Sequence, residues 1–123
     1  MMYWPTLRYN MQHDLIRVRH MLAASKEAME FAAGKTRQNL QKDRIRVLAI
    51  IKSIEIIGEA ASKVTEEFKS ENKYIPWNDI ISMRNRLVHA FFDVDLDIVW
   101  QTVKSDLPDL IKALEKILPP EKT

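Results

Sequence analysis

The sequence predicts an all-α protein, an up-and-down bundle of four main helices plus a short fifth. Apolar residues recur at intervals of three and four almost throughout, and no segment shows the alternation typical of a strand. Only two glycines occur in 123 residues, and helix-forming residues dominate. With 46% hydrophobic and 29% charged residues, we expect one globular domain over residues 1–123, with loosely ordered ends at 1–9 and 119–123.

The first helix is expected from about Asn10 to Ala33. Gly34 follows directly, and glycine suits the left-handed backbone that often ends a helix. The apolar positions of this segment keep helical spacing at Met11, Leu15, Val18, Leu22, Met29 and Ala32. One helix of this length can therefore present a continuous apolar stripe to the rest of a bundle.

The second helix is expected from about Gln38 to Lys69, and it is apolar on two sides. One side carries Val47, Leu48, Ile51, Ile54 and Gly58, and another carries Ile50, Ile57, Ala60, Val64 and Phe68. A helix that is apolar nearly all round is buried on several sides, so in this small bundle we expect a second copy of the chain to cover one of them. Gly58 costs about 1 kcal/mol relative to alanine in mid-helix, which indicates close approach by another backbone.

The remaining helices are shorter. The stretch "ENKYIPWNDI" is typical of a turn, with Pro76 suited to the first position of a third helix that runs to about Val88. The stretch "FFDVD" breaks the helical pattern. Asp95 can then cap a fourth helix, and Ser105 or Asp106 can cap a fifth.

Arg84 is unexpected on the third helix, because it falls at the centre of the apolar stripe. At about 100° per residue, its apolar neighbours lie within about 60° on either side: Trp77, Ile81 and Val88 on one, Ile80 and Leu87 on the other. An unpaired buried charge costs several kcal/mol, so Arg84 needs an acidic partner or an open cleft. Glu55 on the second helix is the obvious carboxylate, and a structural ion pair would be sufficient explanation.

His89 follows Arg84 by five residues, which is about 140° of rotation on a continuous helix. The two side chains could therefore not share one face. They could converge if the helix ended near His89 and the backbone turned, or if each met its counterpart across a two-fold axis. A half-buried histidine at a helix C-terminus, interacting with the helix dipole, is the ordinary alternative.

Composition excludes several classes of function. There is no cysteine, so disulfide, thiolate and cysteine-ligated zinc chemistry are excluded. No segment has the length of a membrane span or the pattern of a signal peptide, and we expect a soluble cytoplasmic protein. No phosphate-binding glycine loop, nucleophile elbow or magnesium-type carboxylate cluster occurs. An enzyme of this composition would transfer a phosphodiester without a metal or other cofactor.

The net charge of only +2 does not by itself indicate a nucleic-acid partner. The charges are, however, unevenly distributed along the chain. Residues 35–52 carry six basic residues against one acid, and residues 93–109 carry five aspartates against one lysine. Such patches can steer a charged ligand, although a solvated surface is the more common explanation.

The stretch "IPWNDIISMRNRLVHAFFDVDLDIVW", preceded by "IEIIGEAASKV", closely resembles the HepT-like ribonuclease family within the HEPN group of small helical proteins. The resemblance extends from about His13 to Leu118. The signature of the group is arginine, a polar residue, a few intervening positions, histidine and, two residues later, usually tyrosine. In this sequence it corresponds to Arg84, Asn85, His89 and position 91.

The resemblance implies a homodimer in which two Arg–His motifs line one cleft and cleave RNA without a metal. It also implies a toxin that is paired with a small nucleotidyltransferase antitoxin. In this interpretation His89 takes the proton of a ribose 2′-hydroxyl. Arg84 stabilises the charged phosphate, and Asn85 orients the hydroxyl or a phosphate oxygen.

Phe91 departs from the signature, because it stands where the related toxins carry tyrosine. That tyrosine is the hydroxyl that the antitoxin modifies with AMP, and phenylalanine cannot accept the group. The modification site is therefore unknown, with Tyr74 and Tyr9 as unsupported substitutes. The departure keeps an alternative open, in which a non-catalytic binding module docks a nucleotidyltransferase and presents a nucleotide or substrate to it.

Overall fold

The computed structural model describes residues 4–90 and 93–120, without the side chains of residues 4–9, 89 and 90, and the predicted all-α bundle is confirmed. The element order is α1 (Trp4–Ala32), α2 (Arg37–Gln41), α3 (Arg44–Ser62), α4 (Glu66–Glu71), α5 (Trp77–Leu87), β1 (Val88–Ala90), β2 (Asp93–Val94), α6 (Leu96–Gln101), the π-helix η1 (Thr102–Asp106) and α7 (Leu107–Ile117). The first helix begins earlier than expected, and it is followed by Gly34 at φ 71°.

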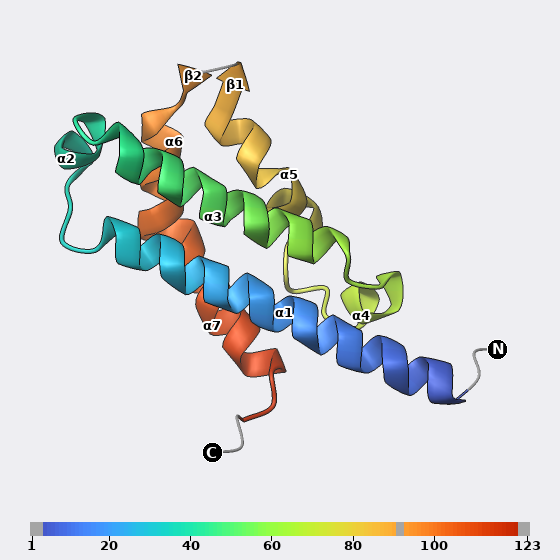
Figure 1. Cartoon of the computed structure of the whole chain (residues 1–123). Coiled ribbons are helices and arrows are strands. Elements are labelled where there is room, and N and C mark those ends of the chain that lie inside the picture. The colour runs from blue at the N-terminus through green and yellow to red at the C-terminus, as the bar shows by residue number, and fades with distance from the viewer. Residues whose placement is uncertain (1–3, 91–92, 121–123) are drawn as a thin grey trace.

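The long helices pack against one another as a bundle (Figure 1). Helices α1 and α3 lie side by side and antiparallel, α3 also packs against α5, and α1 packs against α7. The fully buried side chains between them include Met21, Ile50, Ile54, Leu87, Val99, Leu107 and Leu114. None of the helices described is long and apolar enough to span a membrane.

The prediction of a single helix over residues 38–69 is wrong, because this segment forms α2, α3 and α4. Asp43 caps α3 by accepting a hydrogen bond from the Arg46 backbone N–H, which together with the Arg46 guanidinium lowers the pKa of Asp43. Thr65 caps α4, and its backbone N–H and hydroxyl both donate to the buried Asp14 of α1, at 2.9 and 2.7 Å. Local capping hydrogen bonds and the long-range bonds from Thr65 to Asp14 thus interrupt the helix, although the apolar pattern continues.

Gly58 confirms the close helix approach that the sequence predicts. A Cβ atom at this position would lie 3.2 Å from the carbonyl oxygens of both Ile80 and Ile81. These oxygens belong to the backbone of α5, so they can move aside only if the helix itself moves. The glycine therefore sets the distance between α3 and the helix that carries Arg84.

Replacing Gly58 with leucine should destabilise the protein by up to about 2 kcal/mol. Overpacking usually costs about 1–3 kcal/mol, and the better helix propensity of leucine offsets up to about 1 kcal/mol of that cost. Urea unfolding measures the difference. Glu59→Leu is the matched control, since Glu59 is exposed on the same helix; equal stability of the two variants would contradict the close approach.

The two apolar sides predicted for residues 38–69 are packed within this one chain, so the expectation that a second copy covers one of them loses its basis. Ile54 and Ile57 are both 0% exposed, and of the two sets only Leu48 is clearly exposed, at 45%. A third stripe stays open, because Ile45 is 84% and Ile56 is 36% exposed. Ile45, Leu48 and Ile56 fall on one face of α3, which we call the α3 outer face.

Two further expectations about the last third of the chain are wrong. The sequence predicts no strand, but the structure contains a short antiparallel hairpin, in which Val88 pairs with Val94. Asp95 caps α6 as predicted, by accepting from the Ile98 N–H at 3.2 Å. Asp106 caps nothing with its side chain, because α6 continues through η1 into α7 without interruption.

Candidate functional site

Arg84 lies at an edge of α5 rather than at the centre of its buried face. The buried residues of this helix are Trp77, Ile80, Met83 and Leu87. Met83 was absent from the predicted stripe, and because it lies about 100° from Arg84 it moves the centre of the buried face away from the arginine. The side chain of Arg84 is 46% exposed, so no unpaired charge is buried.

Glu55 of α3 is the acidic partner of Arg84, as predicted. The Arg84 Nε lies 3.7 Å from Glu55 Oε2, and the Glu55 side chain is 40% exposed. Lys52 donates to the other carboxylate oxygen at 3.3 Å. An ion pair this exposed contributes little to stability. Its effect is to orient the guanidinium while leaving N–H groups accessible to an anionic ligand.

The chain changes direction between Arg84 and His89. Helix α5 ends at Leu87, and Val88 is extended with φ −128° and ψ 107°. The Leu87 carbonyl then accepts from the Asp95 N–H at 2.8 Å, which closes the hairpin at its base. The backbone condition for convergence of Arg84 and His89 is thus met. The side chain of His89, and Phe91 as a whole, lie outside the described residues.

Asn85 is exposed on α5 beside Arg84. Arg86 points away from this pair and interacts with Asp79 on the other edge of the helix, with its Nη2 3.3 Å from the Asp79 carbonyl oxygen. The short helix therefore presents two separate polar edges. Arg84 lies on the edge next to α3, where it pairs with Glu55.

The basic patch of residues 35–52 is partly neutralised by ion pairs. Arg37 pairs with Asp97, Arg46 with Asp43, and Lys52 with Glu55. Arg44 is exposed, and it lines a cavity of about 140 Å³ with Leu48 of the α3 outer face, Val94 of the hairpin and Leu96 of α6. This proximity of a basic residue to the hairpin depends on tertiary packing, and nothing in the local sequence indicates it.

No cluster of three or more histidine, aspartate or glutamate side chains suited to a metal ion occurs in the part of the chain described. The chemical groups at the Arg84 edge are instead a guanidinium, a carboxylate, a primary amine and an amide. Such a set can bind a phosphate through charge-assisted hydrogen bonds. Proton transfer near neutral pH would require the imidazole of His89.

Known proteins resemble this chain over most of its length. The family model "Ribonuclease HepT-like" matches residues 21–117. "Putative RNase TTE0752" of Caldanaerobacter subterraneus is 34% identical over 84% of this chain and 92% of its own. "Probable ribonuclease HepT" of Thermococcus cleftensis is 38% identical over 74% of this chain and 86% of its own. No solved structure matches.

The matched region includes α3, α5 and the hairpin, so it includes the Arg84–Glu55 pair and the backbone that carries His89. The resemblance noted for the sequence and the match of the family model thus agree on the same segment. The chain belongs to the HepT-like ribonuclease family.

Proposed function

We propose that the protein is a metal-independent endoribonuclease whose catalytic residues are Arg84, His89 and Asn85. The observation that carries the proposal is the accessible guanidinium of Arg84, held by Glu55 at 3.7 Å just before the chain turns toward His89. A purely structural ion pair has no need of this exposure. A phosphate ligand needs it, because the free N–H groups must reach the phosphate oxygens.

The proposed reaction is an internal transesterification. The neutral imidazole of His89 takes the proton of a ribose 2′-hydroxyl, the 2′-oxygen bonds to the adjacent phosphorus, and the bond from phosphorus to the 5′-oxygen breaks. Arg84 stabilises the negative charge that develops on the phosphate oxygens, and Asn85 orients the attacking hydroxyl or an oxygen of the phosphate. The second protomer's protonated imidazole gives the leaving oxygen its proton. The products are a 2′,3′-cyclic phosphate and a 5′-hydroxyl.

The proposal includes a homodimer and a role as the toxin of a toxin–antitoxin pair with a nucleotidyltransferase. Family membership supports the toxin role. The dimer is supported by the α3 outer face, where Ile45 and Leu48 are 84% and 45% exposed on the helix that also holds Glu55. Pairing two copies through this face would bring two Arg84 edges into one cleft.

Incubating the purified protein with RNA in excess EDTA is the direct test. We expect cleavage that survives chelation and yields 2′,3′-cyclic phosphate ends. A substrate with a single 2′-deoxyribose at the mapped cleavage position should remain intact there, because the attacking hydroxyl is missing. Cleavage that stops in EDTA, or that continues at the deoxy position, would contradict this mechanism.

Failure of the folded wild type to cleave any RNA would contradict the enzyme. It would favour the alternative in which the chain is a non-catalytic module that docks a nucleotidyltransferase. Phe91 at the signature position of tyrosine is the observation behind this second candidate. The digestion in EDTA therefore distinguishes the two functions with one protein preparation.

A further inference from the structure

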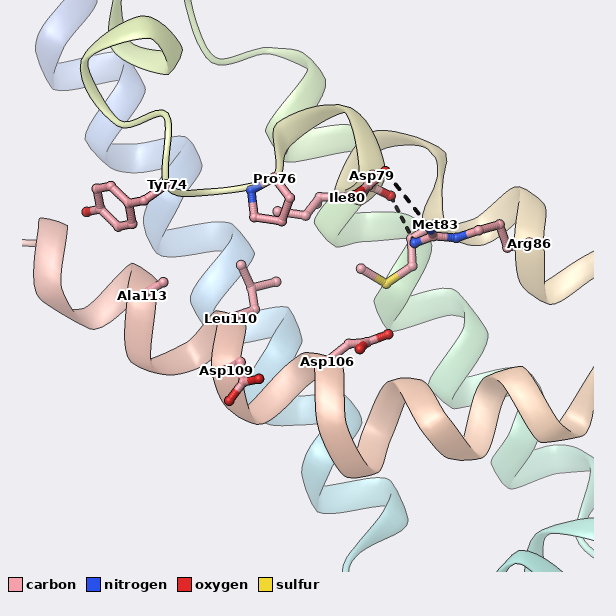
Figure 2. Close-up of a pocket in the computed structure, with 10 residues that line it drawn as sticks. All are labelled: Tyr74, Pro76, Asp79, Ile80, Met83, Arg86, Asp106, Asp109, Leu110 and Ala113. Atoms are coloured by element: carbon pink, nitrogen blue, oxygen red, sulfur yellow. Dashed lines mark hydrogen bonds and ion pairs between the residues drawn. The ribbon is translucent and has the colours of Figure 1, made fainter.

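A groove lies on the edge of α5 away from Glu55, between α5 and α7, and it has a volume of about 360 Å³. Figure 2 shows Leu110 and Ala113 of α7 facing Pro76, Ile80 and Met83 on the opposite wall. Ile80, Met83 and Leu110 are buried, so the floor of the groove is apolar. Volumes of this size accommodate one or two bulky side chains or a small ligand.

The rim of this groove is acidic. Asp79, Asp106 and Asp109 line it, and Arg86 is the one base among the lining residues. Arg86 already interacts with Asp79 (Figure 2). Asp106 and Asp109 have no hydrogen-bond or ion-pair partner within the described ranges 4–90 and 93–120. They also belong to the segment with five aspartates against one lysine.

The charge of the rim decides which kind of ligand fits. Carboxylates repel the phosphates of RNA, so the groove does not extend the proposed RNA site. They attract a cation, and the apolar floor adds hydrophobic contact for an uncharged side chain beside it. The helix dipole stabilises an acid in the first turn of α7, which is an alternative reason for Asp109 to stand there. That interaction does not explain why an apolar floor lies beside it.

The two kinds of contact are also separated along the groove. Asp106 and Ala113 are seven residues apart on η1 and α7, which corresponds to about 10 Å. In Figure 2, Tyr74 lies beyond Ala113 at one end, and Asp106 lies at the other. Tyr74 is 58% exposed, and exposed tyrosines are frequent anchors of protein interfaces. An occupant therefore presents a cation at one end and apolar surface toward the other.

We propose that this groove docks a segment of another polypeptide, in which a bulky apolar side chain stands next to arginine or lysine. The apolar side chain contacts Ile80, Leu110 and Ala113, and the cationic side chain pairs with Asp106 and Asp109. A segment of this kind meets both ends of the groove at once. The inference does not depend on the proposed ribonuclease activity, because the groove and the Arg84 edge lie on different sides of α5.

Methyl and amide NMR of the full-length protein provides the test, with two acetylated and amidated tripeptides as probes. Leu-Arg-Leu should shift the resonances of Ile80, Leu110 and Ala113 in a saturable manner. Leu-Glu-Leu, which differs only in the charge of its central residue, should bind at least tenfold more weakly. Shifts that are equal for both peptides, or that fall outside the groove, would overturn the proposal.

Variants separate the rim from the floor. The double variant Asp106→Asn/Asp109→Asn should weaken binding of Leu-Arg-Leu at least tenfold, whereas Glu30→Gln/Glu59→Gln removes the same charge elsewhere and should leave binding unchanged. Ala113→Phe keeps the rim acids and fills the floor, and it should also weaken binding. Unchanged binding by either groove variant would refute the site, and so would spermidine binding as tightly as the peptide, since that ligand has no bulky apolar group.

Discussion

His89→Ala should lower the rate of RNA cleavage in EDTA by about 10²–10⁴-fold, the usual contribution of a general acid or base. The imidazole is the one group proposed to take the proton of the 2′-hydroxyl, and alanine offers no substitute. The hairpin that carries His89 is held by backbone hydrogen bonds, including the 2.8 Å bond from Asp95 N–H to the Leu87 carbonyl. The variant should therefore keep its fold, which circular dichroism and light scattering can verify. Undiminished cleavage by a folded His89→Ala protein would rule out the mechanism.

The Arg84–Glu55 pair provides an internal comparison for this prediction. Arg84→Ala should cost about 10²–10³-fold, the range seen when one donor to a developing negative charge is removed. Glu55→Gln removes the charge beside the guanidinium but keeps the size of the side chain, and an exposed ion pair is weak, so its effect should be at least tenfold smaller. If Glu55→Gln were as damaging as Arg84→Ala, the carboxylate itself would act on the substrate.

The sequence predicts the structure where the signal is local or where chemistry leaves few choices. Asp95 follows a break in the helical pattern, which predicts a cap, and its side chain accepts from the Ile98 N–H. Gly58 indicated a close helix approach, since a mid-helix glycine has few other justifications. Glu55 was the acid available to Arg84, and the two are in contact.

The first failure comes from a contact between residues distant in sequence. The apolar pattern runs through residues 38–69, and the break before α4 depends on the bond from Thr65 to Asp14, 51 residues away. The second failure is local: aspartate is a preferred cap residue and Pro108 suits the start of a helix, but the backbone continues through η1 without a break. Helix periodicity reports which side of a segment is buried, and not whether its backbone is interrupted.

Arg84 shows why the candidate site was predicted only in part. Its residue types were identified from the sequence, but its orientation was not. The buried face of α5 includes Met83, which the predicted apolar stripe leaves out. With Met83 included, the centre of that face shifts and Arg84 lies at its edge. The same limitation applies to α3. The sequence places Ile57 on one of two apolar sides and predicts that a second copy covers one of these sides. In the structure Ile57 is buried within one chain.

The proposed dimer can now be tested at positions that do not disrupt the core. Ile57 is 0% exposed, so a glutamate there would unfold the chain and reveal nothing about association. Ile45 and Leu48 are exposed on α3, and they lie about 10–15 Å along the helix axis from Glu55. A two-fold interface centred on them would place both Arg84–Glu55 pairs near its border.

The double variant Ile45→Glu/Leu48→Glu should therefore convert the dimer into a folded monomer and remove RNA cleavage with it. Each substitution occurs twice in a symmetric interface, and burying unpaired carboxylates there costs several kcal/mol. We expect the dimer dissociation constant to rise at least about 100-fold. Light scattering measures the mass, circular dichroism the helix content, and digestion in EDTA the activity.

The matched control places the same two changes at exposed positions of α1, as Met11→Glu/Ile16→Glu, where the parent residues are 58% and 43% exposed. This variant should remain a dimer and keep cleaving RNA, because its new charges stay in water. A wild type that is already monomeric, or an Ile45→Glu/Leu48→Glu monomer that cleaves at the full rate, would contradict a site shared by two subunits. In that case Arg84 and His89 of a single chain would have to supply both the acid and the base.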